Sequence, residues 1–566
     1  MFIDARGFAD DARLQAQVCI VGGGAAGIAL ALRLGQRGID VVLLEAGGRR
    51  HEARTQRLYE GEVTDARLHP PADRYRERRL GGSTATWGGR CVPFDPIDFE
   101  ARDYIPHSGW PISYEELARY YDEASLLCEA GPARYRAADA FPDGSAPPVA
   151  GFAAARFSDD TLERFSCPTD FGQRYRLRLD GAARTRVVLH ANVTALRLDG
   201  DGNRIAAVLA RTLDGRRIEV QADFVVLAAG GLETARLLLA SHDRQPAGIG
   251  NGHDLVGRYY MCHLAGTIGN LRLGHGVAVA HGYQRSADGV YCRRRFALRE
   301  DAQRTLRCGN FIARLHHPRI GDPAHGSAVL SLLFLARRLI PYEYAKRLHD
   351  GDSAPRDWLA HARNVARDPC AAFAFAWQML TQRKLASRKF PSIIVTPREP
   401  CFSLDFHAEQ VPNPSSRVQL SEQRDELGMP RLRIDWRHTQ ADVDTVQRAL
   451  AAFAADVRDS GVGRFDYAAE SIEQEMLRYG AYGGHHIGTA RMAATPRTGV
   501  VDTDLRVHGV GNLFVASAAV FPTSSQANPT LTIVALALRL GDHLQRRLAP
   551  AQAASPAALS IEELAA

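Results

Sequence analysis

The sequence predicts an α/β protein with more than one domain, whose chain opens with a strand–helix–strand unit. The apolar run Gln17–Val21 indicates a buried strand, and a glycine-rich turn follows it. Apolar residues from Ile28 to Leu34 then indicate a helix that ends at Gly38, and Val41–Leu44 indicates a second buried strand. At 566 residues the chain is too long for a single compact core.

The composition is that of an ordinary globular protein. Hydrophobic residues make up 45% and charged residues 24% of the chain. The net charge is +6, but basic and acidic residues are interspersed, so we expect no nucleic-acid partner. The nine cysteines are scattered, odd in number and form no CxxC pair, which argues against disulfides and structural zinc. We therefore expect no metal site.

The amino terminus and the apolar runs bear on location. The first fifteen residues include three aspartates and no apolar core, so we expect no signal peptide. No apolar run approaches the roughly 18 residues of a membrane span, so we expect no transmembrane segment. A cytoplasmic location is the resulting expectation. Residues 551–566, rich in Ala and Ser, are predicted to be a flexible tail.

The turn after the first strand, residues 22–27, fits the pattern G-x-G-x-x-G. Such a loop lets the backbone approach a pyrophosphate, and the following helix directs its N–H groups toward it. Glu45 lies at the end of the next strand, where a carboxylate can accept hydrogen bonds from ribose hydroxyls. The pattern predicts a dinucleotide site, with a tight structural turn as the alternative, but does not separate FAD from NAD. The predicted contacts are Gly22, Gly24, Ala26, Gly27 and Glu45.

A second glycine cluster lies at residues 79–90. Small residues with free backbone donors suit close packing against a flat, polar ring system, although a purely structural loop has a similar composition. The candidate cofactor contacts in this cluster are Gly81, Gly82, Ser83, Thr86 and Trp87.

The carboxyl-terminal region contains several ordered motifs. They are Gly483–Met492, Gly499–Asp502, Arg506–Val510, Asn512–Ala516, Val520–Thr523 and Asn528–Thr532. Together with the amino-terminal turn, they resemble the glucose-methanol-choline (GMC) family of FAD oxidoreductases. Four further segments fit the family pattern: Ala191–Thr194, Val225–Leu239, Asn251–Arg258 and Pro412–Val418.

The resemblance implies a two-part architecture. A Rossmann-like FAD-binding domain is expected to be non-contiguous and to comprise residues 1–110, 181–264 and 476–550. A substrate-binding domain, built on an antiparallel sheet flanked by helices, is expected to comprise residues 111–180 and 265–475. FAD is the expected hydride acceptor.

The resemblance also implies roles for individual residues. His485 matches the catalytic histidine of the family, and Asn528 matches a second active-site position that is His or Asn. Val193 matches a position whose backbone contacts the adenine. Thr86 stands where some members carry the histidine that binds FAD covalently, so non-covalent FAD is expected. Many members have an acidic residue where this chain has Ser517, which weakens the prediction of a contact there.

The mechanism that these residues suggest begins with a proton transfer. A neutral imidazole can take the proton of an alcohol, because its pKa lies near neutral pH. The alkoxide that develops would then expel a hydride to flavin N5. We expect His485 to be the base and Asn528 to donate a hydrogen bond to the same oxygen. Two alternatives stay open: His485 could be structural, or the neighbouring His486 could be the base.

Asn528 and Pro529 also resemble a helix start, with Asn as the cap and Pro as the first helical residue. A pure capping role is therefore the alternative for Asn528. A helix beginning there would direct its positive end toward the pyrimidine side of the flavin. We accordingly expect Asn528, Pro529 and Thr530 to contact the cofactor.

The substrate is predicted only as a class. The motifs are most similar to the sugar-oxidising branch, which favours a sugar, a glycoside or another alcohol. Oxygen, a quinone or another carrier could reoxidise the flavin, and the oligomeric state is not predicted. The basic, amphipathic stretch 355–389 is expected to face the core rather than to dock on a membrane or cover the entrance. Alternatives for the whole protein are an NAD-dependent dehydrogenase and a non-catalytic flavoprotein.

Overall fold

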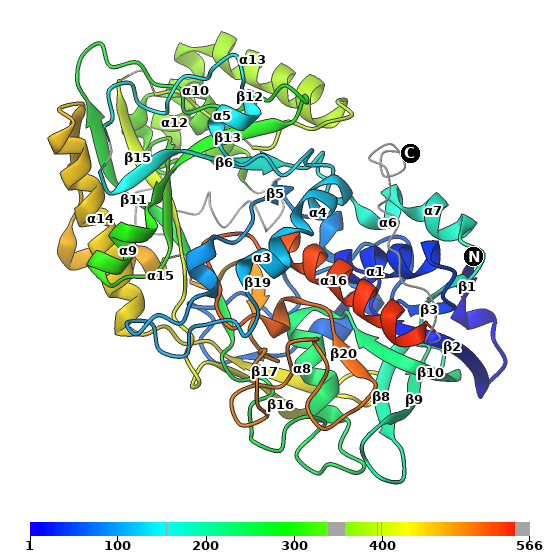
Figure 1. Ribbon diagram of the computed structural model, residues 1–566. Helices are drawn as coiled ribbons and strands as arrows, with labels where there is room; N and C mark the ends of the chain where they lie inside the picture. Colours follow the sequence, from blue (N-terminus) through cyan, green and yellow to red (C-terminus); the bar gives the residue numbers. More distant parts are fainter. Residues whose placement is uncertain (154, 338–356, 393, 398, 479, 550–566) are drawn as a thin grey trace.

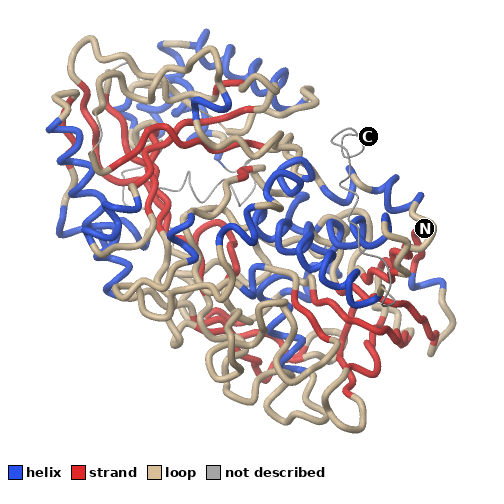
Figure 2. Tube along the Cα trace, in the orientation of Figure 1, coloured by secondary structure: helices blue, strands red, loops and turns tan. Residues whose placement is uncertain are grey.

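The computed structural model describes residues 1–153, 155–337, 357–392, 394–397, 399–478 and 480–549. These residues form two large sheets, each with its own apolar core, and one small sheet. The two large sheets occupy opposite parts of the molecule, with helices around them (Figures 1 and 2). The predicted tail lies outside the described residues. None of the described helices is both long enough and apolar enough to span a membrane.

The first large sheet has eight strands and contains the predicted opening unit. Its strands are β1 (Phe2–Asp4), β2 (Ala12–Val21), β3 (Val41–Leu44), β7 (Thr185–Leu189), β8 (Asn192–Leu198), β9 (Ile205–Arg211), β10 (Arg217–Leu227) and β20 (Leu513–Val515). The strands β1, β7, β3, β2, β10 and β20 run parallel, whereas β8 and β9 pair in antiparallel fashion. Buried parallel strands need helices on their faces, and helices α1 and α16 supply part of that cover.

Seven helices pack around this sheet. They are α1 (Ala25–Gln36), α3 (Tyr114–Ala118), α4 (Tyr121–Leu127), α6 (Phe171–Arg174), α7 (Arg176–Gly181), α8 (Gly230–Ala240) and α16 (Thr530–Leu548). The predicted helices after residues 27 and 530 are confirmed as α1 and α16, which pack against each other. Helices α3, α4, α6 and α7 contribute to the same core. The expected domain boundaries differ from this arrangement, because they placed residues 111–180, which include these four helices, in the substrate domain.

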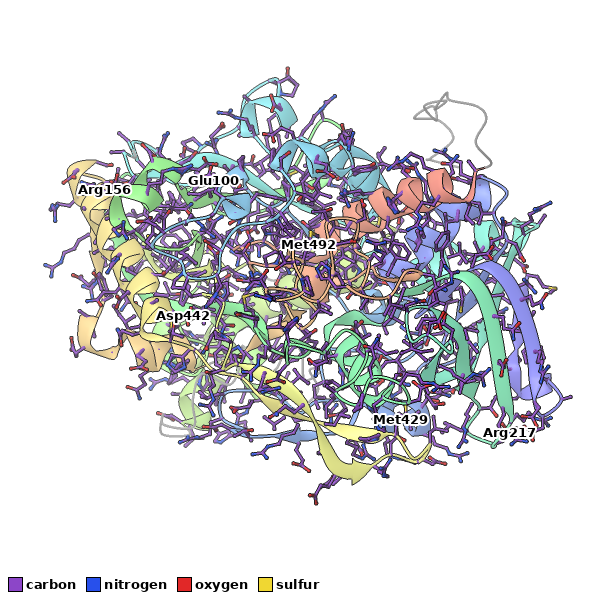
Figure 3. The ribbon with its side chains drawn as sticks, turned by 60° about the horizontal axis from the view of Figure 1, so that its bottom comes forward. Glu100, Arg156, Arg217, Met429, Asp442 and Met492 are labelled. Atoms are coloured by element: carbon purple, nitrogen blue, oxygen red, sulfur yellow. The ribbon has the colours of Figure 1, made fainter. Side chains whose placement is uncertain are left out.

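The second large sheet has nine strands, and its pairs are antiparallel. Its strands are β5 (Arg90–Cys91), β6 (Phe157–Phe165), β11 (Met261–Leu273), β12 (Gln284–Arg285), β13 (Tyr291–Leu298), β14 (Phe311–His316), β15 (Cys401–Ala408), β18 (Gly463–Asp466) and β19 (Tyr482–Ile487). Helix α14 (Gln440–Asp459) lies at the outer edge of the molecule in Figure 1, and α9 (Glu300–Leu306) and α15 (Ile472–Leu477) lie near it. Figure 3 places Asp442 of α14 and Arg217 of β10 at opposite ends of the molecule.

The two faces of this second sheet differ in chemistry. Successive side chains of a strand point to opposite faces. On β15, Phe402, Leu404 and Phe406 enter the apolar core that α14 covers. The alternate residues Asp405 and His407 line a cavity instead. The strand period of two thus turns a polar surface toward the first sheet.

The remaining elements form smaller units. A third sheet contains β4 (Glu62–Val63), β16 (Arg417–Arg424) and β17 (Pro430–Asp435). The other helices are α2 (Ala53–Gln56), α5 (Ala137–Ala140), α10 (Ala328–Leu335), α12 (Trp358–Arg367) and α13 (Pro369–Gln378). A π-helical segment, Met379–Lys384, continues α13.

The stretch 355–389 departs from its expected core-facing role, as far as it is described (residues 357–389). Phe375 packs against a small cluster that includes residues of α10. Phe373 and Trp377, however, are 72% and 58% exposed. The expectation is wrong for these two side chains, because one turn of α13 cannot direct all three aromatic residues to the same face. No described residue of this stretch lines the cavity between the two large sheets, but Pro391 and Ser392, just after the stretch, do.

Candidate active site

A cavity of about 440 Å³ is lined by residues from both large sheets. It brings together most of the predicted site residues, although they come from distant parts of the chain. These are Gly22, Gly24, Ala26, Glu45, Gly82, Ser83, Thr86, Trp87, His485, Ser517, Asn528, Pro529 and Thr530. Gly27, Gly81 and Val193 are not among its lining residues.

The first glycine loop packs as a dinucleotide site requires. Gly22 has a φ of +108°, and a Cβ on Gly27 would lie 1.9 Å from the carbonyl oxygen of Gly22. Gly27 therefore serves the close packing of α1 on the loop rather than the cavity surface. Gly24, the N-cap of α1, makes no side-chain cap, so the first N–H groups of the helix remain available to an anion. The donors and the close backbone approach fit a pyrophosphate.

Glu45 is buried and holds this loop. Its two carboxylate oxygens accept hydrogen bonds from the backbone N–H groups of Gly23 and Gly47, each at 2.8 Å. Burial raises the pKa of the Glu45 carboxyl, and the two backbone hydrogen bonds oppose that rise. Glu45 thus anchors the turn while lining the cavity, and its contact with a ribose stays a prediction.

The second glycine loop lies directly against the first. Gly81 has a φ of +93°, and its N–H donates to the carbonyl of Gly23 at 2.7 Å. Thr86 lines the cavity at the position where a covalent link would need a histidine. The Trp87 indole N–H donates to the Thr169 carbonyl at 3.0 Å, which leaves the ring at the cavity wall. Val193 lies in β8, paired with Ala210, and its adenine contact stays a prediction.

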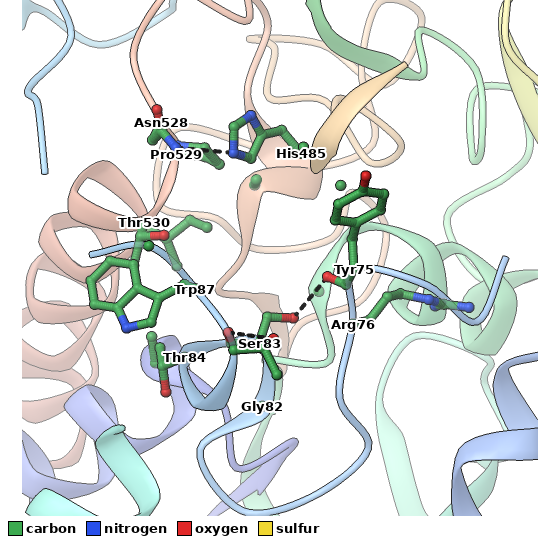
Figure 4. A pocket seen from close by; sticks show the side chains of 18 of the residues that line it. Tyr75, Arg76, Gly82, Ser83, Thr84, Trp87, His485, Asn528, Pro529 and Thr530 are labelled. Atoms are coloured by element: carbon green, nitrogen blue, oxygen red, sulfur yellow. Dashed lines mark hydrogen bonds between the residues drawn. The ribbon is translucent and has the colours of Figure 1, made fainter. Parts of the chain in front are cut away.

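His485 and Asn528 face each other in the cavity (Figure 4). Atom Nε2 of His485 lies 3.1 Å from Nδ2 of Asn528. Its other ring nitrogen, Nδ1, lies 2.6 Å from Nδ1 of His263, and His263 Nε2 lies 3.0 Å from the carbonyl oxygen of Ser524. A chain of three hydrogen bonds therefore runs from the backbone at Ser524 through His263 and His485 to Asn528.

This chain determines where the protons are. The Ser524 carbonyl can only accept, so Nε2 of His263 carries a proton, and Nδ1 of a neutral His263 is an acceptor. His485 must then donate from Nδ1, which leaves the lone pair of its Nε2 in the cavity. The amide N–H of Asn528 donates to that lone pair. His485 is thus held in the tautomer that a general base requires.

The environment also keeps both imidazoles neutral. Burial lowers the pKa of His485 well below its usual value, and the positive charge of Arg90 lowers it further. Burial likewise lowers the pKa of His263 to about 4, and the hydrogen bond that His263 donates to the Ser524 carbonyl opposes the shift. An uncharged imidazole can accept a proton, so the site is in its base form at neutral pH.

Asn528 does not cap the final helix, so the alternative prediction of a pure capping role for it is wrong. The N-cap of α16 is Pro529, and no side chain caps it. The Asn528 carbonyl oxygen instead accepts a hydrogen bond from Arg90 Nη1 at 2.5 Å. Arg90 thereby orients the amide so that its nitrogen faces His485.

His486 points to a different set of partners. Its Nδ1 lies 2.6 Å from the Tyr260 hydroxyl, which is also 2.8 Å from His69 Nε2 and 3.4 Å from Cys262 Sγ. His69, Cys262 and His486 are the one set of ligand atoms among the described residues that is close enough to hold a metal ion. No metal was expected from the sequence, and the Tyr260 hydroxyl already bridges the two rings.

The polar face of the second sheet forms the opposite wall. Arg314 makes ion pairs with Glu163 at 2.9 Å and with Asp405 at 2.8 Å. Arg90 pairs with the same Glu163 at 2.7 Å. Burial raises the pKa of Glu163, but the surrounding arginines outweigh this effect and lower it to about 2. Arg293 lines the cavity beside them.

Sequence reasoning did not identify several of these residues. They are His263, Arg90, Glu163, Arg293, Arg314, Asp405 and His407. They belong to strands with alternating polar and apolar residues, a pattern that also describes a sheet with one face in water. The alternation of polar and apolar residues was the one sequence signal for these residues. It does not show that the polar face of the sheet is turned toward the inside of the protein.

Comparisons with known proteins identify the family of the chain. A family model described as FAD dependent oxidoreductase matches residues 17–360, which is more than half of the chain. A second model, described as GMC oxidoreductase, matches residues 412–537. The chain is an FAD-dependent oxidoreductase of the GMC family. FAD is therefore its cofactor, and the NAD-dependent alternative is left without support.

Three similar proteins illustrate the extent of the match of this GMC oxidoreductase. The 2-methyl-1,2-propanediol dehydrogenase of Mycolicibacterium austroafricanum is 26% identical, over 94% of this chain and 96% of the relative. The fructose dehydrogenase large subunit of Gluconobacter japonicus is 25% identical, over 94% and 97%. The crystal structure of pyridoxine 4-oxidase from Mesorbium loti has a TM-score of 0.52 at 18% identity, over 93% of this chain and 99% of that one. The predicted fold class is confirmed.

Proposed function

We propose that this GMC oxidoreductase oxidises a CH–OH group of a sugar, glycoside or other alcohol to a carbonyl, with His485 as the catalytic base. The observation that carries the proposal is the neutral His485, with its Nε2 lone pair in the cavity and Nδ2 of Asn528 at 3.1 Å. A structural histidine would need no acceptor nitrogen directed into a cavity.

The chain's own residues account for the proton transfer. Nε2 of His485 takes the proton of the substrate hydroxyl, and His263 accepts the hydrogen bond from Nδ1–H of the imidazolium that forms. Asn528 has a second amide N–H that can donate to the substrate oxygen as negative charge develops there. Arg90 holds that amide in place. FAD, when bound, supplies the acceptor for the hydride that leaves the carbon.

The names of the similar proteins favour this substrate class. One is named for a diol and another for a sugar. Aromatic side chains, including Tyr283 and Phe165, line the cavity near its polar wall. A cavity with an apolar lining and a few directed polar groups is typical of a small-molecule site.

We also propose that FAD is held without a covalent bond, because Thr86 offers no imidazole to the cofactor. Acid precipitation should then release all of the yellow colour into the supernatant, and colour left in the pellet would contradict it. A cytoplasmic location is part of the same proposal. It is supported by nine cysteines that are all free, as is usual in reducing compartments.

The decisive experiment compares the activities of variants in which one of three histidines is replaced by asparagine. His485→Asn should lower the rate of anaerobic flavin bleaching by an alcohol by at least about 100-fold, as removal of a general base does, while FAD stays bound. His508→Asn is the control, because its ring contacts the Ala493 carbonyl and does not line the cavity. A full loss of activity in His486→Asn with an active His485→Asn would reassign the base. Failure of every alcohol to bleach the flavin would refute the function.

A further inference from the structure

We propose that the alcohol substrate carries a carboxylate, and that Arg293 with its neighbour Arg314 binds this group at the cavity wall formed by the second large sheet. The inference rests on the proposed function and narrows the substrate to a polyhydroxy acid, such as an aldonic or uronic acid. We use "arginine wall" for Arg90, Arg293 and Arg314, which all line the cavity.

The arginine wall carries more positive charge than its partners neutralise. Glu163 and Asp405 are buried and provide two negative charges to the three guanidinium groups. Glu163 is shared by Arg90 and Arg314, and Asp405 pairs with Arg314. Arg293 makes no salt bridge within the described part of the chain. Glu163 and Asp405 act on its charge only from beyond salt-bridge distance. A buried charge without a counter-ion in contact is costly, so this position suits an anionic ligand.

The contacts of Arg293 leave donors available. Its Nε donates to the His281 carbonyl at 3.1 Å and its Nη2 to the Leu315 carbonyl at 2.5 Å. Nη1 makes no hydrogen bond to any residue that the structure describes. Arg293 is only 7% exposed, so the two backbone contacts hold the guanidinium rigidly at the cavity wall. Preorganised arginine donors match a planar carboxylate.

The third arginine, Arg90, contacts the proposed catalytic residues and not the proposed carboxylate site. It bonds to Asn528 and Glu163, and it is the one arginine whose charge acts on the pKa of His485. Arg293 lies opposite Glu163 in the β13–β6 strand pair, and its side-chain hydrogen bonds go to the His281 and Leu315 carbonyls, not to His485 or Asn528. It therefore binds a part of the substrate that is not oxidised, and the carboxylate takes no part in the oxidation.

Aromatic side chains complete the subsite. The Tyr283 ring lies under the Arg293 guanidinium, with 5.7 Å from Cζ to the ring centroid. Phe165 packs edge-on against Tyr283 at 5.1 Å. Both rings line the cavity. A flat aromatic surface beside a cation suits the carbon skeleton of a polyol next to its acid group.

The test compares acids with their neutral counterparts. The pairs are gluconate with sorbitol, glucuronate with glucose and galacturonate with galactose. Wild-type enzyme should give the acid at least about tenfold higher kcat/KM for anaerobic flavin bleaching in one pair or more. Arg293→Met should lower the acid's value by about 10- to 100-fold and leave the neutral partner unchanged, as the loss of a charged hydrogen bond predicts. Arg293→Lys should restore part of the loss.

Two further measurements keep the outcomes distinct. Arg294→Met is the matched control, because Arg294 lies on the same strand but contacts the Asp159 and Ser145 carbonyls. Calorimetric titration of each acid into FAD-loaded His485→Asn enzyme measures binding without turnover. Acids that bind no more tightly than their neutral partners, or equal losses for both in Arg293→Met, would overturn the inference. Neutral sugars that bleach the flavin in that case would leave the proposed function standing.

Discussion

Replacing His263 tests whether the hydrogen-bond chain to His485 sets the tautomer of the base. In His263→Leu the Nδ1–H of His485 loses its acceptor in a buried site. An unsatisfied buried donor costs about 1–3 kcal/mol, and the proton can avoid that cost by moving to Nε2. The reactive tautomer would then be disfavoured by a factor of roughly 5 to 150. We expect the rate of flavin reduction to fall by that factor.

A conservative variant separates the hydrogen bond from packing. His263→Asn should recover much of the rate, because its side-chain oxygen can accept a hydrogen bond near the former position of Nδ1. His361→Leu is the control, since His361 is a buried histidine bonded to Ser331 in another part of the fold.

The assay is anaerobic stopped-flow reduction of the flavin by one alcohol at several pH values, with the FAD content of each variant measured beforehand. A His263→Leu enzyme that keeps the wild-type rate would refute the tautomer argument. Equal losses in the Leu and Asn variants would show that His263 acts through packing alone.

Three other predictions follow from the site. The Gly27→Ala variant should lose FAD or unfold, because the new Cβ would lie 1.9 Å from the Gly22 oxygen. Flavin absorbance measures the loss of FAD, and thermal denaturation measures the loss of stability. A normal FAD content would contradict the prediction. Arg90→Met should lower the rate about tenfold through the freed Asn528 amide. The same variant should move the acid limb of the kcat/KM profile to higher pH, because the charge of Arg90 lowers the pKa of His485. An acid limb at the wild-type pH would contradict this effect of Arg90 on His485. Finally, His263 is neutral when folded, with a pKa of about 4, and protonates near pH 6.5 when unfolded. The unfolded state therefore binds more protons on acidification, and His263 alone should reduce the free energy of unfolding by about 2 kcal/mol between pH 8 and pH 5. His263→Asn should flatten that part of the denaturation profile, and an unchanged slope would show that the ring is not neutral.

Much of the first sheet could be predicted from local patterns. The strands before and after the first glycine loop, the helix between them and the final helix are observed close to the expected positions. Each is a continuous apolar run or a helical period bounded by glycine or proline, and such signals need no distant partner. The aromatic residues of 355–389 show the limit of this reasoning. Phe373 and Trp377 are exposed because their orientation depends on which neighbours α13 meets.

The site divides in the same way. The motif around His485 and the Asn528–Pro529 pair could be found in the sequence, because both lie in ordered motifs that resemble those of the GMC family. His263, Arg90 and Arg293 could not, since nothing in their local sequence distinguishes them from other polar residues on strands.

The sequence alone predicted the dinucleotide-binding opening and the histidine that we propose as the base, and its resemblance to a family predicted FAD. The tertiary structure decided the tautomer of that histidine and the charge of the cavity. Both depend on groups more than 200 residues apart in the chain, such as His263 and His485 at 2.6 Å. Antiparallel pairing brings those groups together, and the two-residue period of the strands then directs their side chains into one cavity.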